Sequence, residues 1–387
     1  MRQFRPALLA GAVAAVAACS DQGPVASAAA PEAAPLLSAS AAGRAVEGSY
    51  IVVLKEGENP RSVAAIAGVE PRFVYTAVLN GFAATLNHGQ LNALRHNRAV
   101  ASVEEDQVVE TKSTQLNAPW GLDRIDQRSR PLDGKYNYTS TGSSVRAYII
   151  DTGIYTAHPE FGTRAQNVYD ALGGNGADCN GHGTHVAGIV GSTTYGVAKQ
   201  VQLRGIRAVN CSGSGTTSGI IASIDWVRLN AQKPAVANLA LGGGFSSTLN
   251  TAVNNLANSG IFIAVVAGGE NQNACNVSPA SAAAAFTTGA STSTDARASF
   301  SNYGSCVDGF APGSSITSTW LGGGTNTLSG ASMASAFVTG VAALYKSVFG
   351  DAASATVDSW LKNNATANVL TGVPSGTPNR LLYKSTL

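Results

Sequence analysis

The chain has 387 residues, of which 44% are hydrophobic and only 12% are charged, and its formal net charge is +2. Such a chain can build a sizeable core, and it lacks the excess of basic residues that a nucleic-acid-binding protein usually carries. The 43 glycines favour many tight turns. The composition is therefore typical of a low-charge globular protein such as a secreted enzyme.

The N-terminal residues predict an export signal. "MRQFRP" gives a basic start, and "ALLAGAVAAVAAC" follows as an apolar run that ends in small residues. The run is too short to be a stable membrane anchor, so residues 1–19 are predicted to be a secretory signal peptide. "VAAC" also resembles a bacterial lipobox, which would make Cys19 a lipidation site. An ordinary export signal is the main expectation, lipidation of Cys19 is the alternative, and no transmembrane span is expected.

A linker and a small domain are predicted next. Residues 20–47 are mostly Ala, Ser and Pro with few large apolar side chains, which is typical of a linker. Residues 48–112 alternate between strand-like and helical patterns and predict a small α+β domain. Its expected strands are 50–54, 73–86 and 101–110, and its expected helices are 61–69 and 88–100.

Residues 113–387 show a different alternation. Continuous apolar strands separated by helices predict a mostly parallel sheet with helices on both faces. The expected strands are 145–151, 201–209, 236–243 and 261–269, and the expected helices are 218–232 and 247–260. The fold class is therefore α/β, and the chain has no internal repeat.

The cysteines of the exported part form an even set. Five cysteines are present, and Cys19 belongs to the leader; the others are Cys179, Cys211, Cys275 and Cys306. An even set in an exported chain predicts two disulfides. Four cysteines allow three pairings, and their spacing does not choose among them.

The strand predicted at residues 145–151 ends in a carboxylate, Asp151. In open α/β sheets, functional groups collect at the carboxyl ends of the strands. A carboxylate next to a buried strand is costly unless it has partners. Asp151 is therefore a candidate catalytic residue, and a turn or helix cap is the alternative.

"NGHGTHVAGIVGS" places His182 and His185 at the start of an apolar helix. A metalloprotease helix would carry H-E-x-x-H, but Gly183 occupies the place of the glutamate, which argues against a zinc site. We expect His182 to be an exposed base at the helix start, with His185 buried behind it.

"LSGASMASAFVTGVAALY" places Ser332 at the start of another apolar helix. An N–H in that position points out along the positive end of the helix dipole and can receive an oxyanion. Ser332 is thus a candidate nucleophile, and a plain N-cap is the alternative. Together, Asp151, His182 and Ser332 supply the orienting acid, the base and the nucleophile of a serine hydrolase. Their chain order argues against an α/β-hydrolase, which runs Ser, Asp, His with a G-x-S-x-G elbow.

Three segments resemble those that carry the catalytic triad of subtilisin-like serine proteases: "YIIDTGI", "NGHGTHVAG" and "LSGASMASAFVTG". Three more resemble the proteinase K branch, and aqualysin-type members in particular: "APWGLDRIDQR", "CSGSGTTSGIIASIDWV" and "DARASFSNYGSCVDGFAPG". The resemblance covers residues 113–387. It implies a subtilisin-like fold and a secreted, monomeric serine endopeptidase that acts on polypeptides and has neither a nucleic-acid partner nor an organic cofactor.

Residues 48–112 resemble the inhibitor-type propeptide of these proteases. By this resemblance the segment is a ferredoxin-like α+β unit that assists folding, inhibits the enzyme and is removed by it. The mature chain is then expected to begin near Ser113.

The resemblance also implies a disulfide pairing and a substrate-binding groove. Relatives of the aqualysin type pair sequential cysteines, which gives Cys179–Cys211 and Cys275–Cys306. Two segments resemble the strands that bind the substrate backbone by β-augmentation; they are Ser212, Gly213, Ser214 and Gly215, and Leu241, Gly242 and Gly243. The two glycines of the second segment leave room for a large apolar P1 side chain.

Two oxygen-rich groups resemble calcium sites of this branch. The first comprises Asp123, Asp126, Gln127 and Asp133. The second combines Asp308 with the carbonyls of Ala283 and Ala285. Hard oxygen ligands suit Ca²⁺, so structural calcium is expected, and solvated surface acids are the alternative.

The sequence departs from the family at the oxyanion position. The family usually reads A-A-G-N where this chain reads V-A-G-G, so Gly269 stands in place of the asparagine that supplies a hydrogen-bond donor. Asn271 is a possible substitute. Elsewhere Ala240 replaces a frequent serine, and Ala336 and Phe337 replace Pro-His. The main hypothesis is an active endopeptidase with a weakened oxyanion hole, and the alternative is a peptide-binding pseudoprotease.

Overall fold

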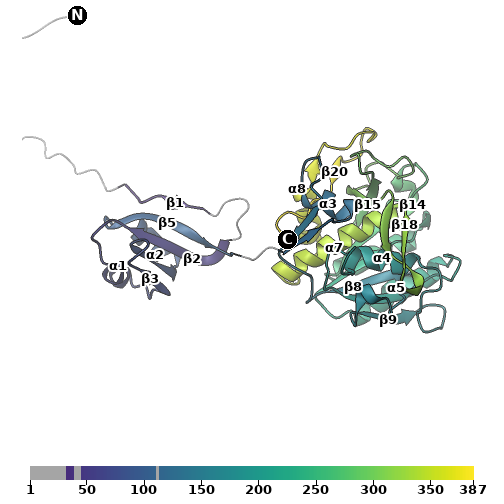
Figure 1. The fold of residues 1–387 in the computed structure, drawn as a ribbon, viewed down its shortest axis with the longest axis horizontal. Helices are drawn as coiled ribbons and strands as arrows, with labels where there is room; N and C mark the ends of the chain where they lie inside the picture. The colour runs from purple at the N-terminus through teal and green to yellow at the C-terminus, as the bar shows by residue number, and fades with distance from the viewer. Residues whose placement is uncertain (1–31, 39–44, 110–112) are drawn as a thin grey trace, which may run out of the picture. The chain divides into compact units, whose positions relative to one another are not determined.

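The computed structural model describes residues 32–38, 45–109 and 113–387. The chain divides into two compact units, Met1–Val109 and Glu110–Leu387 (Figure 1). The predicted signal peptide and Cys19 lie outside the described residues.

The described part of the smaller unit is a five-stranded sheet with two helices. Its elements are β1 (Leu36–Leu37), β2 (Ala45–Leu54), α1 (Pro60–Ile66), β3 (Phe73–Tyr75), β4 (Gly81–Thr85), α2 (His88–Arg95) and β5 (Val100–Gln107). The strand order is β1-β5-β2-β4-β3, and β2 runs antiparallel to both β4 and β5. From β2 to β5 this is the β-α-β-β-α-β arrangement of ferredoxin-like units, as the resemblance implied.

Two details of this unit differ from the sequence prediction. The run 73–86 was predicted as one strand, but it forms two, β3 and β4, which pair antiparallel. The turn between them is fixed by Asn80, whose side chain donates to the carbonyl oxygens of Lys55 and Glu58 at 2.9 and 2.8 Å. In addition, β1 and the start of β2 fall inside the predicted linker. The leucines of β1 pair in parallel with β5, so the sheet includes residues that composition alone assigned to a linker.

The larger unit contains a nine-stranded sheet in the order β19-β20-β16-β15-β13-β11-β8-β10-β9. All neighbouring pairs in it are parallel except β19 and β20. The strands of this sheet are β8 (Arg146–Asp151), β9 (Ala165–Asp170), β10 (Gln202–Arg207), β11 (Ala235–Leu239), β13 (Phe262–Val266), β15 (Phe286–Ser291), β16 (Gly309–Pro312), β19 (Thr366–Ala367) and β20 (Arg380–Leu381).

Helices and short strands surround this sheet. The helices are α3 (Trp120–Asp126), α4 (His182–Gly191), α5 (Thr217–Asn230), α6 (Ser247–Asn258), α7 (Ala331–Phe349) and α8 (Ser354–Asn364), with short 3₁₀ turns at Pro159–Phe161, Ala274–Asn276 and Leu321–Gly323. Three two-stranded ribbons complete the unit: β6 (Ser113–Leu116) with β7 (Lys135–Tyr138), β12 (Gly243–Gly244) with β14 (Val277–Ser278), and β17 (Ile316–Thr319) with β18 (Thr325–Leu328).

Alternate residues of each central strand enter two different cores. On β8, Ala147 and Ile149 pack with α4 and α7, whereas Tyr148 and Ile150 pack with α5 and α6. Strands buried on both faces must be apolar at consecutive positions, which explains the unbroken run in the sequence. The predicted parallel sheet with helices on both faces is confirmed.

Helix α7 runs through the first of these cores. With 19 residues, α7 is long and apolar enough to cross a membrane. However, 78% of an apolar stretch of 18 of these residues is buried inside the protein, as expected for a core helix. Its Phe337 packs on Gly121 of α3, where an added Cβ would lie 2.4 Å from the ring. Phe337 therefore fills space that a larger residue on α3 would otherwise take.

Candidate active site

The end of β8 and the start of α4 bring Asp151 and His182 together. Asp151 is fully buried, and its Oδ1 and Oδ2 lie 2.7 and 2.9 Å from His182 Nδ1. Its Oδ1 also accepts a hydrogen bond from the Thr152 amide at 2.7 Å. The carboxylate thus holds one ring nitrogen of His182, which leaves Nε2 available to exchange a proton.

The electrostatic environment favours the protonated imidazole. Burial by itself lowers the pKa of His182, but the charge of Asp151, its hydrogen bond to the ring and the charge of Asp178 together raise the pKa above its ordinary value. The His182 side chain is 26% exposed, so the ring is both held by the protein and open to a ligand. Such an imidazole suits a general base that must also carry a positive charge during the reaction.

The glycines around His182 allow the strand end and the helix start to approach closely. Gly181 has φ 105°, a value that favours glycine. At Gly183, an added Cβ would lie 2.2 Å from the carbonyl oxygen of Gly153. Glycine at position 183, which argued against H-E-x-x-H, is therefore required by packing. His185 is fully buried, as predicted, and burial lowers its pKa to about 4.

A second buried carboxylate, Asp178, was not singled out from the sequence. Its Oδ1 accepts from Thr152 Oγ1 and from the Gly181 amide, each at 2.9 Å. Its Oδ2 accepts from the hydroxyl and the amide of Thr184 at 2.6 and 3.0 Å. Asp178 therefore joins the end of β8 to the first turn of α4. The N-cap of α4 is Gly181, which has no side chain, so Asp178 does not occupy the position at which a capping residue is recognised in a sequence.

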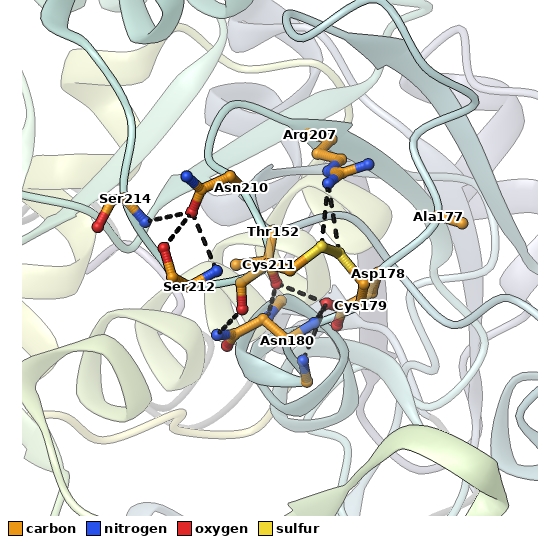
Figure 2. Close-up of a disulfide and its surroundings, with 12 residues drawn as sticks. Thr152, Ala177, Asp178, Cys179, Asn180, Arg207, Asn210, Cys211, Ser212 and Ser214 are labelled. Atoms are coloured by element: carbon orange, nitrogen blue, oxygen red, sulfur yellow. Dashed lines mark hydrogen bonds between the residues drawn. A yellow bond between two sulfur atoms is a disulfide. The ribbon is translucent and has the colours of Figure 1, made fainter.

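A disulfide stabilises the same region (Figure 2). Cys179 and Cys211 are bonded, and Arg207 Nη2 lies 3.3 and 3.5 Å from their sulfur atoms. Asn180 links the two sides, because its Nδ2 donates to the Cys211 carbonyl at 2.9 Å and its Oδ1 accepts from the His182 amide at 3.1 Å. The structure also contains the other disulfide that the resemblance implied, Cys275–Cys306.

Ser332 is the second residue of α7 and lines a cavity of about 470 Å³. Its Oγ donates to the carbonyl oxygen of Ala240 at 3.1 Å. Among the described residues, no hydrogen bond joins it to His182. Catalytic hydrogen bonds are often long or misaligned in the free enzyme and tighten only with substrate. The structure thus forms one of the two contacts of the predicted triad and places Ser332, the predicted nucleophile, at a cavity wall.

The cavity includes part of the predicted substrate-binding segments. Its walls are Ala240, Gly242, Gly243, Gly244, Val266, Gly268, Gly269, Glu270, Gln272, Val277, Ser278, Gly330, Ala331 and Ser332. Leu241 packs instead against the core beneath α5 and α6. Ser212, Gly213, Ser214 and Gly215 form an exposed segment outside this cavity. Asn210 Oδ1 holds that segment by accepting from the amides of Ser212 and Ser214, each at 3.0 Å.

The predicted oxyanion position, Gly269, is open. An atom added at Cβ of Gly269 would meet nothing within 4 Å. Asn271, the substitute considered from the sequence, is not among the lining residues, and its backbone N–H donates to the Phe300 carbonyl at 2.8 Å. Glu270 does line the cavity, and its Oε2 accepts from the Gly269 amide at 3.0 Å. The sequence reasoning missed Glu270 and Gln272, although they closely follow Gly269.

Three members of the first predicted calcium group have partners within the protein, although the charges of Asp126 and Asp133 both act on Asp123. Asp126 Oδ1 lies 3.1 Å from Lys384 Nζ, Asp133 Oδ2 lies 3.6 Å from the ammonium of a nearby lysine, and Gln127 donates to the carbonyl of a proline at 2.8 Å. Asp123 alone has a buried oxygen, Oδ1, without a partner, and burial raises its pKa. Among the described residues, no three His, Cys, Asp or Glu side chains are grouped to hold a metal. Calcium at this first group therefore stays a prediction.

The second predicted calcium group lies on neighbouring strands. Ala283 and Ala285 precede β15, and Asp308 precedes β16, which pairs with β15. However, Asp308 Oδ1 lies 2.8 Å from Lys362 Nζ. An ammonium at this distance occupies one side of the carboxylate, so these residues do not fit a calcium ion while the lysine is in place.

Residues 142–380 match the family model described as the subtilase family. The chain belongs to the subtilase family. Residues 49–112 match a second family model, peptidase inhibitor I9. This subtilase is therefore a serine protease that carries an inhibitor-type propeptide.

Known subtilases resemble the chain over most of its length. The extracellular serine proteinase of Thermus sp. (strain Rt41A) is 48% identical, over 95% of this chain and 96% of its own. Proteinase R of Parengyodontium album is 42% identical, over 92% of each chain. The crystal structure of a cold adapted subtilisin-like serine proteinase is 50% identical, with a TM-score of 0.68, and covers 69% of this chain and 98% of its own.

Proposed function

We propose that this subtilase is a secreted serine endopeptidase in which Asp151 orients His182 and His182 activates Ser332. The observation that carries the proposal is the hydrogen bond of 2.7 Å between Asp151 Oδ1 and His182 Nδ1. It fixes the ring so that the other nitrogen is left for the nucleophile. The placement of Ser332 in the first turn of α7, at the wall of the cavity, supports its role.

In this mechanism the Ser332 hydroxyl rotates from the Ala240 carbonyl toward His182. Its oxygen attacks the carbonyl carbon of the scissile peptide bond while its proton passes to His182 Nε2. The resulting oxyanion accepts a hydrogen bond from the Ser332 backbone N–H. This N–H is one of those at the start of α7 that have no partner within the helix. His182 then gives the proton to the leaving amine. Water next attacks the carbonyl carbon of the acyl-enzyme while His182 takes one of its protons, and His182 returns that proton to the Ser332 oxygen as the acid product leaves.

We propose that the cavity beside Ser332 receives the P1 side chain. Gly242, Gly243 and Gly244 leave room along one wall, and Val266 and Val277 supply apolar surface. These features support a broad preference for apolar P1 residues. Glu270 adds one carboxylate to the cavity. Because a carboxylate attracts a cation, the cavity should also accept basic P1 side chains.

Two observations favour the alternative of a peptide-binding pseudoprotease. Gly269 has no side chain to donate to the oxyanion, and the Ser332 hydroxyl is bonded to Ala240 rather than to His182. Loss of one donor slows a reaction of this type by roughly 10²–10³ and does not abolish it. The Asp151–His182 pair would have no role in a protein that only binds peptides, so we favour the active enzyme.

A serine-directed fluorophosphonate probe tests this proposal. The full chain should be labelled, and the Ser332→Ala and His182→Ala variants should not. A chain that folds but takes up no label at any pH between 6 and 10 would support the pseudoprotease instead.

Maturation gives a second, independent test. We propose a signal peptide at residues 1–19, a linker that ends before β1, a propeptide from β1 to residue 112 and a mature protease from Ser113. Sequencing of the N-terminus should find Ser113 or a neighbour in the parent and an uncleaved junction in Ser332→Ala. Radiolabelled palmitate incorporation, compared with Cys19→Ser, distinguishes a lipid-anchored precursor from an ordinary secreted one.

A further inference from the structure

Asp308 has a partner at each of its carboxylate oxygens. Oδ1 lies 2.8 Å from the ammonium of Lys362, and Oδ2 accepts from the Thr287 amide at 2.8 Å. The Asp308 side chain is 22% exposed. The carboxylate is therefore enclosed by a strand on one side and by a lysine on the other.

The lysine that contacts Asp308, Lys362, belongs to helix α8. Lys362 Nζ also lies 2.8 Å from Asp358 Oδ2, one helical turn earlier, and 5.9 Å from the centre of the Phe286 ring. The ammonium of Lys362 therefore lies between two carboxylates and the face of a ring, where a cation is favoured.

We propose that the Lys362 ammonium is the resident cation at the position where the resemblance implies calcium, so that the Asp308 site does not bind Ca²⁺. Calcium requires six to eight oxygen ligands at about 2.3–2.6 Å. The ammonium takes the outward oxygen of Asp308, and its charge repels a divalent ion at the same place. Lys362 reaches the carboxylate from a helix that is anchored in the core through Val357 and Leu361, so it is already positioned in the absence of any metal.

Calcium-dependent thermal stability tests this inference. We would measure the melting temperature of the full chain with Ser332→Ala, which prevents self-digestion, in EDTA and in millimolar CaCl₂. The same measurement is made after adding Asp308→Asn, Lys362→Met, or both. For each variant, the melting temperature in CaCl₂ is compared with that of the same variant in EDTA. A general loss of stability therefore does not affect the calcium-induced difference.

The calcium-induced rise should be the same with and without Asp308→Asn. With Lys362→Met, two carboxylates face each other without a cation, so calcium should add a further rise of roughly 3–5 °C. That extra rise should disappear in the double variant, and Lys362→Arg should not gain it.

Either of two results would overturn the inference. A calcium-induced rise in the Ser332→Ala parent that Asp308→Asn reduces would show that the site binds calcium beside Lys362. Absence of any gain in Lys362→Met would show that the ammonium is not what excludes the metal. The first comparison needs no change at Lys362, so the test stands even if Lys362→Met does not fold.

Discussion

Restoring the missing side-chain donor at position 269 should accelerate catalysis. Gly269 lines the cavity beside Ser332, nothing lies within 4 Å of the Cβ that a substitution would add, and its φ is outside the left-handed region. Gly269→Asn therefore introduces an amide into open space without backbone strain. That amide can donate to the oxyanion, which exists only after Ser332 has attacked.

The expected gain follows from the strength of such a bond. In a subtilisin, removal of one oxyanion donor lowers kcat by about 10²–10³, or about 2.7–4 kcal/mol. The free amide must also be ordered at the site, which costs roughly 1 kcal/mol in side-chain entropy. We therefore expect kcat of Gly269→Asn to rise by about 10²-fold, near the lower end of that range. KM should change little, because the bond forms in the transition state and not with bound substrate.

The assay measures kcat and KM on a chromogenic peptide anilide with an apolar P1 residue. Gly269→Leu is the matched control, since leucine has nearly the same shape as asparagine but no hydrogen-bond donor. A kcat that stays unchanged in Gly269→Asn would mean that another group already binds the oxyanion. An equal rise in Gly269→Leu would mean that filling the space, and not hydrogen bonding, is responsible.

Three further predictions concern other parts of the site. Because Asp151 raises the pKa of His182 and only the neutral ring accepts a proton, kcat/KM should fall as the pH is lowered through a midpoint above about 6.5; a lower midpoint in a pH–rate profile contradicts this. Glu270→Gln should lower kcat/KM for P1 lysine by up to about fivefold, the value of a surface ion pair, and leave P1 leucine within twofold; equal effects on both substrates would exclude a charge effect. Gly183→Ala should lower the unfolding free energy by about 1–3 kcal/mol and reduce activity, because its Cβ would lie 2.2 Å from the Gly153 carbonyl; chemical denaturation that shows no loss contradicts that contact.

The order of elements in the larger unit could be predicted from the sequence because its strands are buried on both faces. Consecutive apolar residues such as Ile149 and Ile150 leave no other arrangement than a parallel sheet covered by helices. The smaller unit was harder to predict. Its β3 and β4 are joined without a change in hydrophobicity, and only Asn80 and the glycine after it mark the turn.

Some features of the candidate site could likewise be predicted from the sequence, and others could not. Asp151 and His182 could be predicted because each follows a pattern that ends or begins an element. The rotamer of Ser332 could not be predicted. Its hydroxyl donates to the backbone carbonyl of Ala240, and every residue type has such a carbonyl. The contact between Asp308 and Lys362 could not be predicted either, because it joins two segments through tertiary packing and neither residue is unusual in its local sequence.

The contact between Phe337 and Gly121 limits how this subtilase can change. A bulky substitution at position 121 would meet the ring at once, so it becomes acceptable only in a background where position 337 has first become smaller. The reverse order is open, because shrinking Phe337 leaves a void that a later substitution at position 121 can fill. The two sites should therefore covary, and a library that randomises position 121 alone should return almost nothing but glycine.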